Sequence, residues 1–454
     1  MVRAGVASVA VHAILTGGQP GSGRSPRKSV YLLYSILLAI GFVLALPWFL
    51  WRDRPTGKYL RTFRERMGRL PVYLNLDGDR TIWIHAVSVG EVLAARPLVP
   101  LLRERFPSLK VFLSTTTVTG HAVASRGVRD LDGLFIAPFD WQGPVRKALS
   151  VLKPALLVLV ETELWPNLIH EARCHGARVA LVNGRISPRS FGRYRLIRRF
   201  LRPVLSDIDL FLMQGDAHAE RIREMGAPAE RVRVTGNLKF DAVEAGRQSD
   251  RLARLLRGDL SGGRPLWVAG STVSGEEELV LQAFHRVRQR VPEAALLIAP
   301  RHPERFDAVA PLVEAAGFRC LRRTTLEPGV WRDGEVLLLD TLGELAQVYS
   351  LATVVFVGGS LVPSGGHNIL EPAFAGRPVI VGPHMENFHE IRELFRAEQA
   401  LVEVRGADEL AREVAELMTD EARRRRLGER ARALVDRNRG ALGRTVDSLA
   451  GLVA

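Results

Sequence analysis

Leu156–Val160 reads LLVLV and runs directly into Glu161–Asn167, which reads ETELWPN. A short, continuous apolar run of this kind is typical of a strand that is buried on both faces, as in a parallel sheet. The polar segment after it holds two carboxylates, an indole and an amide, which cannot be buried without partners except at a large cost in free energy. Polar groups at the carboxyl end of a parallel strand converge on ligands. We therefore interpret Glu161–Asn167 as a ligand-binding loop rather than a structural turn.

Apolar runs alternate with helical stretches on both sides of this loop. In the first half of the chain the expected strands are Thr81–Ala86, Lys110–Thr115, Leu134–Pro138, Leu156–Val160, Arg178–Val182, Leu210–Gln214 and Val232–Thr235. In the second half they are Leu266–Ala269, Ala295–Ala299, Arg319–Leu321, Glu335–Leu339, Thr353–Val357, Pro378–Val381 and Leu401–Val404. Buried strands separated by helices predict parallel sheets covered on both faces. The pattern predicts an α/β protein of two doubly wound, Rossmann-like domains that face a cleft.

An uncharged apolar segment, Val30–Trp51, precedes the first domain. About 20 apolar residues in a helix span a bilayer, so this segment is a candidate transmembrane anchor. Basic residues are frequent between Arg52 and Arg69, and such residues tend to stay in the cytoplasm, which places the catalytic body there. A cleaved signal peptide is the alternative, but its apolar region is usually only about 7–15 residues long. This run also ends in aromatic residues typical of a lipid boundary.

The expected organisation therefore has five parts. They are residues 1–29 as a disordered extension, 30–51 as the transmembrane anchor, 52–241 as the N-terminal domain, 242–263 as a linker and 264–454 as the C-terminal domain.

The net charge of +14 restricts the ligands of the protein. Strong basicity indicates nucleic acid, an anionic lipid surface or an anionic substrate, and the membrane segment favours the last two. A nucleic-acid binder is disfavoured because aromatic residues are not interleaved with basic ones on a strand platform. Histidines and cysteines do not cluster at ligand spacings, so we expect no transition-metal site.

Glu91 follows another expected strand, in His85–Glu91, which reads HAVSVGE. A carboxylate at this strand-to-helix junction could accept a proton in the cleft. It could equally complement the helix dipole, with Ser88 as the cap and Glu91 as its capping-box partner. Position alone does not decide between these two interpretations.

Two further motifs of the first half carry cations. Asn183–Arg202 combines arginines with apolar residues near helical spacing, which suits an anionic membrane surface, phosphate groups or a solvated helix that packs its apolar stripe on the domain. Lys239, in Gly236–Asp241 (GNLKFD), is the last lysine of an arginine-rich chain. A retained lysine hints at a role that a compact ammonium fills and a guanidinium does not.

The second half has the features of a nucleotide site. Arg301, in Pro300–Arg305, follows a strand and could clamp a phosphate. Asp340–Glu344 opens a helix, and Gly358–Ser360 with Ser364–Glu371 forms a glycine-rich loop and a helix start. Glycines let backbone N–H groups approach a phosphate, and a helix N-terminus favours negative charge. The pairs Asn368–Glu371 and Thr341–Glu344 also have capping-box spacing.

Together these motifs resemble the lipid A 3-deoxy-D-manno-octulosonic acid (Kdo) transferases. The strings SVGE, ETELWPN, NGRIS, GNLKFD, PRHPERF, GELAQVY and FVGGSLVPSGGHNILEPA occur in that family's order and spacing, from about Tyr31 to the C-terminus. The resemblance implies the GT-B fold, with an N-terminal acceptor domain, a C-terminal donor domain and a single-pass anchor in the cell inner membrane. It implies transfer of Kdo from CMP-Kdo to lipid IVA, the lipid A precursor, on the cytoplasmic side, with inversion and without a bound metal or cofactor.

The resemblance also implies roles for individual residues. Glu91 is similar to the family's general base, and Glu161 and Lys239 to groups that stabilise the transition state. The positions similar to the CMP-binding residues are Pro300, Arg301, Leu342, Gly343, Glu344, Asn368, Ile369, Leu370 and Glu371. Other GT-B proteins, such as nucleotide-sugar epimerases or transferases with UDP donors, remain the alternative class of enzyme.

Overall fold

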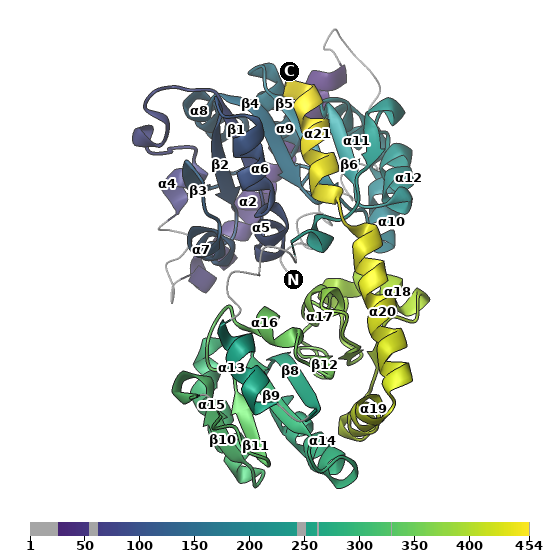
Figure 1. The fold of residues 1–454 in the computed structure, drawn as a ribbon. Helices are drawn as coiled ribbons and strands as arrows, with labels where there is room; N and C mark the ends of the chain where they lie inside the picture. The colour runs from purple at the N-terminus through teal and green to yellow at the C-terminus, as the bar shows by residue number, and fades with distance from the viewer. Residues whose placement is uncertain (1–25, 54–61, 243–250, 261–262, 328, 454) are drawn as a thin grey trace. The chain divides into compact units, whose positions relative to one another are not determined.

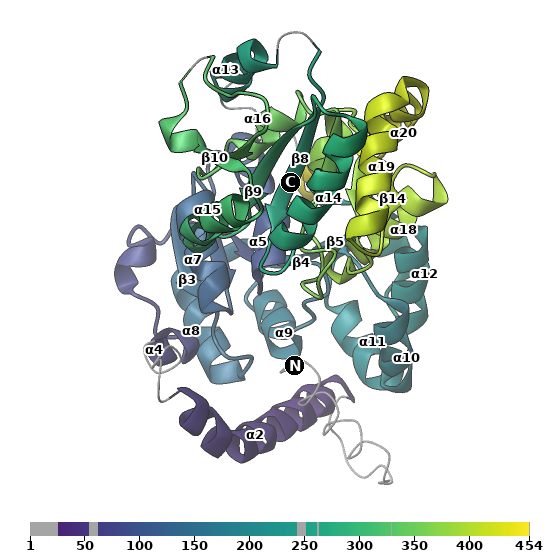
Figure 2. The same ribbon diagram turned by 90° about the horizontal axis from the view of Figure 1, so that it is seen from below.

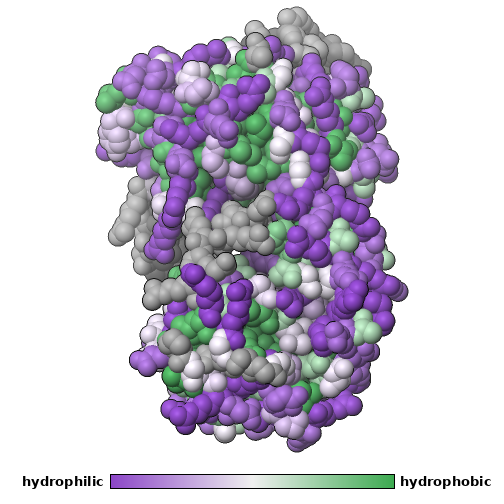
Figure 3. Space-filling model, in the orientation of Figure 1, coloured by the Kyte–Doolittle hydropathy of each residue, from purple (hydrophilic) through white to green (hydrophobic). Residues whose placement is uncertain are grey.

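The structure is a computed structural model that describes residues 26–53, 62–242, 251–260, 263–327 and 329–453. The chain divides into two compact units. The first unit consists of two segments, the chain up to Ala242 and the chain from Gly440 onward. The second unit is Val243–Arg439. Hydrophilic residues cover most of the face drawn in Figure 3.

The first unit is built on a parallel seven-stranded sheet of order β3-β2-β1-β4-β5-β6-β7. Its strands are β1 (Thr81–His85), β2 (Lys110–Thr115), β3 (Gly133–Ile136), β4 (Pro154–Val160), β5 (Arg178–Gly184), β6 (Leu210–Met213) and β7 (Val232–Val234). The order reverses between β1 and β4, which is the point where doubly wound sheets bind ligands.

Helices cover both faces of this sheet (Figure 1). They are α4 (Phe63–Arg66), α5 (Val89–Ala95), α6 (Leu98–Arg105), α7 (Val118–Gly127), α8 (Gln142–Leu152), α9 (Pro166–Cys174), α10 (Pro188–Leu196), α11 (Arg198–Ser206), α12 (Asp216–Met225) and α21 (Ala441–Val453). Short 3-10 turns complete the unit: η1 (Val72–Asn75), η2 (Ala229–Arg231) and η3 (Leu238–Phe240). Successive strand residues point to opposite faces, so Trp83 packs with Leu157 on one face while Ile82 packs with Leu156 on the other.

The second unit repeats the architecture with a parallel sheet of order β10-β11-β9-β8-β12-β13-β14. Its strands are β8 (Leu266–Thr272), β9 (Ala295–Pro300), β10 (Arg319–Arg322), β11 (Glu335–Leu338), β12 (Val354–Val357), β13 (Val379–Val381) and β14 (Val402–Glu403). Its helices are α13 (Arg251–Asp259), α14 (Glu277–Arg290), α15 (Phe306–Ala315), α16 (Leu345–Tyr349), α17 (Leu370–Phe374), α18 (His389–Ala397), α19 (Ala407–Thr419) and α20 (Glu421–Asn438). Its short turns are η5 (Pro303–Arg305), η6 (Arg323–Thr325) and η7 (Glu386–Phe388). Every expected strand is present in the two sheets.

Two of the expected boundaries differ from the observed ones. The C-terminal helix α21 belongs to the first unit and not to the expected C-terminal domain, because it packs on α6, β5 and η3. The expected linker, 242–263, contains α13, which packs against α16; its residues 243–250 and 261–262 lie outside the described parts of the chain.

The apolar N-terminal segment forms helix α2 (Pro26–Asp53). Residues 26–29, which we expected to be disordered, are its first turn, and the rest of the expected extension lies outside the described residues. Within the described ranges, no helix combines the length and the apolar character needed to cross a bilayer, so the expected transmembrane anchor is not confirmed.

Helix α2 packs along the first unit, against α9 and α11 (Figure 2). Its inner stripe has hydrogen-bonding side chains: the Tyr31 hydroxyl donates to Asp207 at 2.7 Å and the Tyr34 hydroxyl to Asp140 at 2.9 Å. Its outer side is apolar, and Val43 and Leu44 are 65% and 70% exposed. The side of the helix that packs on the protein therefore carries tyrosine hydroxyls, and the exposed side is apolar.

The arginine-rich Asn183–Arg202 segment is divided between β5 and the two helices α10 and α11, which meet at Ile197. Leu201, Val204 and Leu205 of α11 are buried in the core, and Phe191 and Tyr194 of α10 pack against it. The interpretation as helices that pack an apolar stripe on the domain is confirmed. Binding of this segment to a membrane surface stays a prediction.

Candidate active site

The three residues expected to act in catalysis lie after strands of the first unit. Glu91 is in the first turn of α5, which follows β1, and Glu161 directly follows β4. Lys239 lies in η3, which follows β7. Because β1 and β4 are neighbouring parallel strands, Glu91 and Glu161 share the carboxyl edge of the sheet.

Glu91 is a buried carboxylate with short hydrogen bonds. It is 2% exposed, and it accepts from the Val87 amide at 2.7 Å and the Ser88 hydroxyl at 2.6 Å. Ser88 is the N-cap residue of α5, but its side chain makes no capping bond to the backbone. The expected capping box is therefore wrong in one respect: the serine hydroxyl donates to the carboxylate instead of capping the helix.

Burial, together with the charges of Glu163 and Glu161, raises the pKa of Glu91 to about 7, against the hydrogen bonds from Ser88 and Val87. A carboxyl group with a pKa near neutrality can exchange a proton with a bound hydroxyl at physiological pH. Of the two interpretations of Glu91, this environment favours the acid–base one.

Glu161 has a strained backbone and two cationic neighbours. Its φ of +59° lies in the left-handed region, which a glutamate seldom adopts and which is characteristic of functional sites. One carboxylate oxygen lies 3.4 Å from Nε of Arg185, and the other lies 3.7 Å from Nζ of Lys239. The ETELWPN, NGRIS and GNLKFD motifs are thus brought together around one carboxylate.

Two residues of this cluster, Glu163 and Arg185, were within motifs that we singled out but were not among the expected site residues. The indole N–H of Trp165 donates to Glu163 at 2.9 Å. The ring centroid of Trp165 lies 4.6 Å from that of the buried His85. The signal for Arg185 was its place directly after a strand, in a segment that we interpreted by its arginines and its apolar spacing and not as part of the active site.

The expected donor residues lie at the carboxyl edge of the second sheet. Arg301 follows β9, and its charge acts on Glu371 and on His367 in the connection from β12 to α17. Burial raises the pKa of Glu371, while the Asn368 hydrogen bond and the charge of Arg301 act in the opposite direction. Burial also lowers the pKa of His367 to about 4, so this imidazole is neutral at pH 7.

The helix start expected within Ser364–Glu371 is present, at Leu370, with a different cap. Asn368 donates to the Glu371 carboxylate at 3.0 Å and accepts from the Leu370 amide at 3.1 Å. Asn368 and Glu371 are thus paired as their spacing predicts, although Ile369 occupies the N-cap position of α17.

The Leu342–Glu344 segment lies before α16, which packs against α17. Leu342 is exposed, and Gly343 has a φ of +84°, a conformation that favours glycine. Glu344 pairs with Arg323 at 3.0 Å and accepts from the Thr341 hydroxyl. Glu344, and not Thr341, is the N-cap residue of α16.

The glycine-rich loop at Gly358–Ser360 is not an open cradle for phosphate. The buried carboxylate of Glu276 accepts the amides of Gly359 at 2.6 Å, Ser360 at 2.9 Å and Leu361 at 2.8 Å. It also accepts the Val273 amide at 3.1 Å. A side chain of the protein thus accepts the amide hydrogen bonds that we expected a ligand phosphate to accept, and this part of the expected donor site is wrong.

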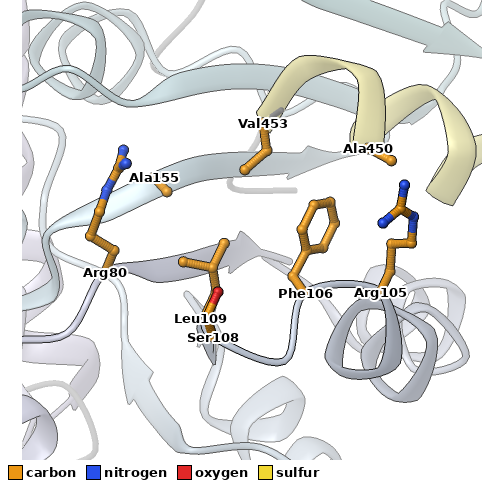
Figure 4. Close-up of a pocket in the computed structure, with 8 residues that line it drawn as sticks. All are labelled: Arg80, Arg105, Phe106, Ser108, Leu109, Ala155, Ala450 and Val453. Carbon is orange, nitrogen blue, oxygen red and sulfur yellow. The ribbon is translucent and has the colours of Figure 1, made fainter.

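A hollow at the other edge of the first sheet is unrelated to this chemistry. It is lined by residues around the amino ends of β1, β2 and β4, including Arg80, Leu109 and Ala155, and by Ala450 and Val453 of α21 (Figure 4). Doubly wound sheets bind their ligands at the opposite edge.

Comparisons with known proteins agree with this arrangement. A family model described as "3-Deoxy-D-manno-octulosonic-acid transferase (kdotransferase)" matches residues 61–242, and one described as "Glycosyl transferases group 1" matches residues 277–434. The 3-deoxy-D-manno-octulosonic acid transferase of Haemophilus influenzae is 39% identical over 81% of this chain and 86% of its own length. That of Bordetella pertussis is 36% identical over 91% of this chain and 97% of its own.

A solved structure supports the fold independently. The UDP-GlcNAc 2-epimerase of Neisseria meningitidis aligns with 82% of this chain and 99% of its own at a TM-score of 0.56, and it is 12% identical in sequence. That likeness concerns the fold alone. Two Rossmann-like domains of this kind form the GT-B fold, and the matching family models and relatives make the chain a glycosyltransferase of that class. The chain belongs to the 3-deoxy-D-manno-octulosonic acid transferase family.

Replacing Glu276 with glutamine is expected to destabilise the second unit. The amide oxygen can keep one pair of amides, but the NH2 group faces the others and leaves buried donors unpaired, at about 1–3 kcal/mol each. We expect the free energy of unfolding, measured by urea denaturation, to fall by about 2 kcal/mol or more. Glu278→Gln, at an exposed position two residues away, is the control, and equal stability of both variants would contradict the role of Glu276.

Proposed function

We propose that this enzyme transfers Kdo from CMP-Kdo to lipid IVA at the cytoplasmic face of the inner membrane, with Glu91 as the general base. The observation that carries the proposal is the position of the Glu91 carboxylate. It is buried, held by Val87 and Ser88 and close to two further carboxylates at the ligand-binding edge of the sheet. Membership of the Kdo transferase family supports the transferred sugar and the reaction type.

The proposed reaction is a single displacement. A sugar hydroxyl of the acceptor attacks the anomeric carbon of Kdo, the bond from that carbon to the phosphate oxygen breaks, and CMP leaves with the electron pair. Glu91 takes the proton of the hydroxyl as the new bond forms. Attack from the face opposite the leaving group inverts the anomeric configuration.

Cationic side chains are proposed to stabilise the charge that develops. Lys239 is held beside Glu161 in the first unit, where it can face the carboxylate of Kdo or the leaving group. Arg301, with Asn368 and Glu371 nearby, is assigned to the phosphate of CMP. Preorganised charges of this kind stabilise a transition state without further reorganisation. Independence from metal ions stays a prediction that an assay with excess chelator tests.

Glu91→Gln is expected to lower kcat about 10²–10⁴-fold, because a positioned general base contributes about that factor. The amide keeps the shape of the side chain but cannot accept the proton. The assay supplies CMP-Kdo, generated in situ, and lipid IVA, and counts added Kdo units by mass spectrometry of the lipid. In the wild-type enzyme, kcat/KM should fall below about pH 7, because the raised pKa of Glu91 leaves the base protonated there.

The matched control is Glu104→Gln, at an exposed position on α6, which should leave turnover and its pH dependence unchanged. Near-normal turnover of Glu91→Gln would refute the assignment of the base. So would an acidic limb at the ordinary glutamate value of about pH 4.5, since that would show that another group titrates.

Arg301→Ala is expected to raise the KM for CMP-Kdo about tenfold or more, with a smaller effect on the KM for lipid IVA. Loss of a hydrogen bond to a charged group corresponds to roughly that factor or more. Competition by CMP and UMP in the same assay separates a cytidine donor from the uridine donors of other GT-B proteins. Arg290→Ala, at an exposed position on α14, is the control, and an unchanged KM for CMP-Kdo in Arg301→Ala would count against the assignment.

Helix α2 is proposed to hold the enzyme at the membrane through its apolar outer side; that it does so as a single-pass anchor stays a prediction. The double variant Val43→Glu/Leu44→Glu should float with vesicles of phosphatidylethanolamine and phosphatidylglycerol at least about tenfold less than the wild type, since charge is costly at membrane depth. Leu76→Glu changes an exposed apolar residue that directly follows η1 and should float normally. Equal flotation of the two variants would exclude α2 as the attachment.

A further inference from the structure

Asp140 lies in the connection between β3 and α8, and it is buried. One of its oxygens accepts the Leu168 amide at 2.7 Å, and the other accepts the Asn167 amide at 3.2 Å. These amides belong to the first turn of α9, whose own N-cap residue, Trp165, makes no side-chain capping bond. Asp140 therefore caps α9 from outside the helix.

The same carboxylate is reached from α2. The Tyr34 hydroxyl donates to the Asp140 oxygen that accepts the Asn167 amide. Ser35 lies within hydrogen-bond distance of the Asn167 side chain, which in turn donates to the backbone carbonyl of Asp140 at 2.6 Å. Two consecutive residues of α2 thus join the cap of α9.

The chain that enters α9 is the loop that carries the acidic cluster. Trp165 immediately precedes the helix, and its indole donates to Glu163, whose charge acts on Glu91. An acidic cap is strongest when it is ionised, because the helix N-terminus carries partial positive charge. Burial raises the pKa of Asp140 to about 7 against the hydrogen bonds from Tyr34, Leu168 and Asn167, which favour the ionised form.

We propose that Asp140 is a positioning residue that couples the packing of α2 on the first unit to the conformation of the Glu161–Trp165 loop. Tyr34 is the contact through which α2 acts. When Tyr34 donates to Asp140, the carboxylate caps α9 firmly and the loop holds Glu163 toward Glu91. When that hydrogen bond is absent, the cap is weaker and the loop loosens. The helix that we assign to the membrane thus supports the acid–base group as well as attaching the enzyme. The inference rests on the proposed role of Glu91.

The competing explanation is that Tyr34 only stabilises the packing of α2. Tyr31 provides a matched comparison, because it also lies on the inner stripe of α2 and donates its hydroxyl to an aspartate, Asp207. Its ring stacks on His170, near the middle of α9 and away from the N-terminal cap. Each tyrosine can lose its hydroxyl and keep its ring.

The experiment compares Tyr34→Phe and Tyr31→Phe in the full-length enzyme on vesicles, with CMP-Kdo and lipid IVA as substrates. For Tyr34→Phe we expect kcat to fall about fivefold, the factor that one hydrogen bond represents, with the KM for CMP-Kdo unchanged. The acidic limb of its pH profile should move to lower pH, because a looser loop takes the negative charge of Glu163 away from Glu91. Asp140→Asn should show the same changes, and more strongly.

Tyr31→Phe should lower the melting temperature without moving kcat or the acidic limb. Equal changes of kcat in the two tyrosine variants would overturn the assignment to Asp140, as would a Tyr34→Phe enzyme that loses only thermal stability. Vesicle flotation of both variants should match the wild type, which excludes loss of attachment as the cause. Failure of the proposed general base is distinguished by Glu91→Gln: if that variant turns over normally, the mechanism is wrong whatever the tyrosine variants do.

Discussion

Buried carboxylates that accept backbone N–H groups organise the edges of both sheets. Glu91 is held by the Val87 amide, Asp140 by two amides of α9, and Glu276 by four amides in two loops. An ionised carboxylate loses several kcal/mol on leaving water, so it persists in the interior only where donors surround it. Each of these loops is therefore fixed by the geometry that keeps one charge satisfied.

This constraint divides the acidic residues by role. Glu276 has four amide donors, more than any other carboxylate described here, and its function is to hold backbone in place. Glu91 accepts from the Val87 amide and the Ser88 hydroxyl, and its acidic neighbours oppose ionisation. Acidic neighbours therefore distinguish Glu91 from Asp140 and Glu276, whose pKa values burial raises without a contribution from neighbouring acids.

The sequence predicts the strands and their order along the chain well, because parallel strands are apolar throughout and end at polar motifs. LLVLV before ETELWPN is enough to place β4 and Glu161. Contacts between groups far apart in the chain are harder to predict from the sequence. That Asp140 caps α9, or that Glu276 fills the glycine loop, depends on which carboxylate reaches a set of amides in space, and no spacing along the chain records this. The return of α21 to the first unit escapes prediction for the same reason, since its apolar stripe would suit either sheet.

Under the proposed assignment of the donor phosphate to the second unit, the occupied glycine loop restricts which groups can bind that phosphate. With the amides of Gly359 to Leu361 bound to Glu276, backbone N–H groups of that loop cannot also neutralise a phosphodiester. The neutral state of His367 at pH 7 removes a second possible cation. Arg301 is then the cation at this edge whose charge reaches both Glu371 and His367. A guanidinium fits that task, because it stays charged in any environment and can bind two phosphate oxygens at once.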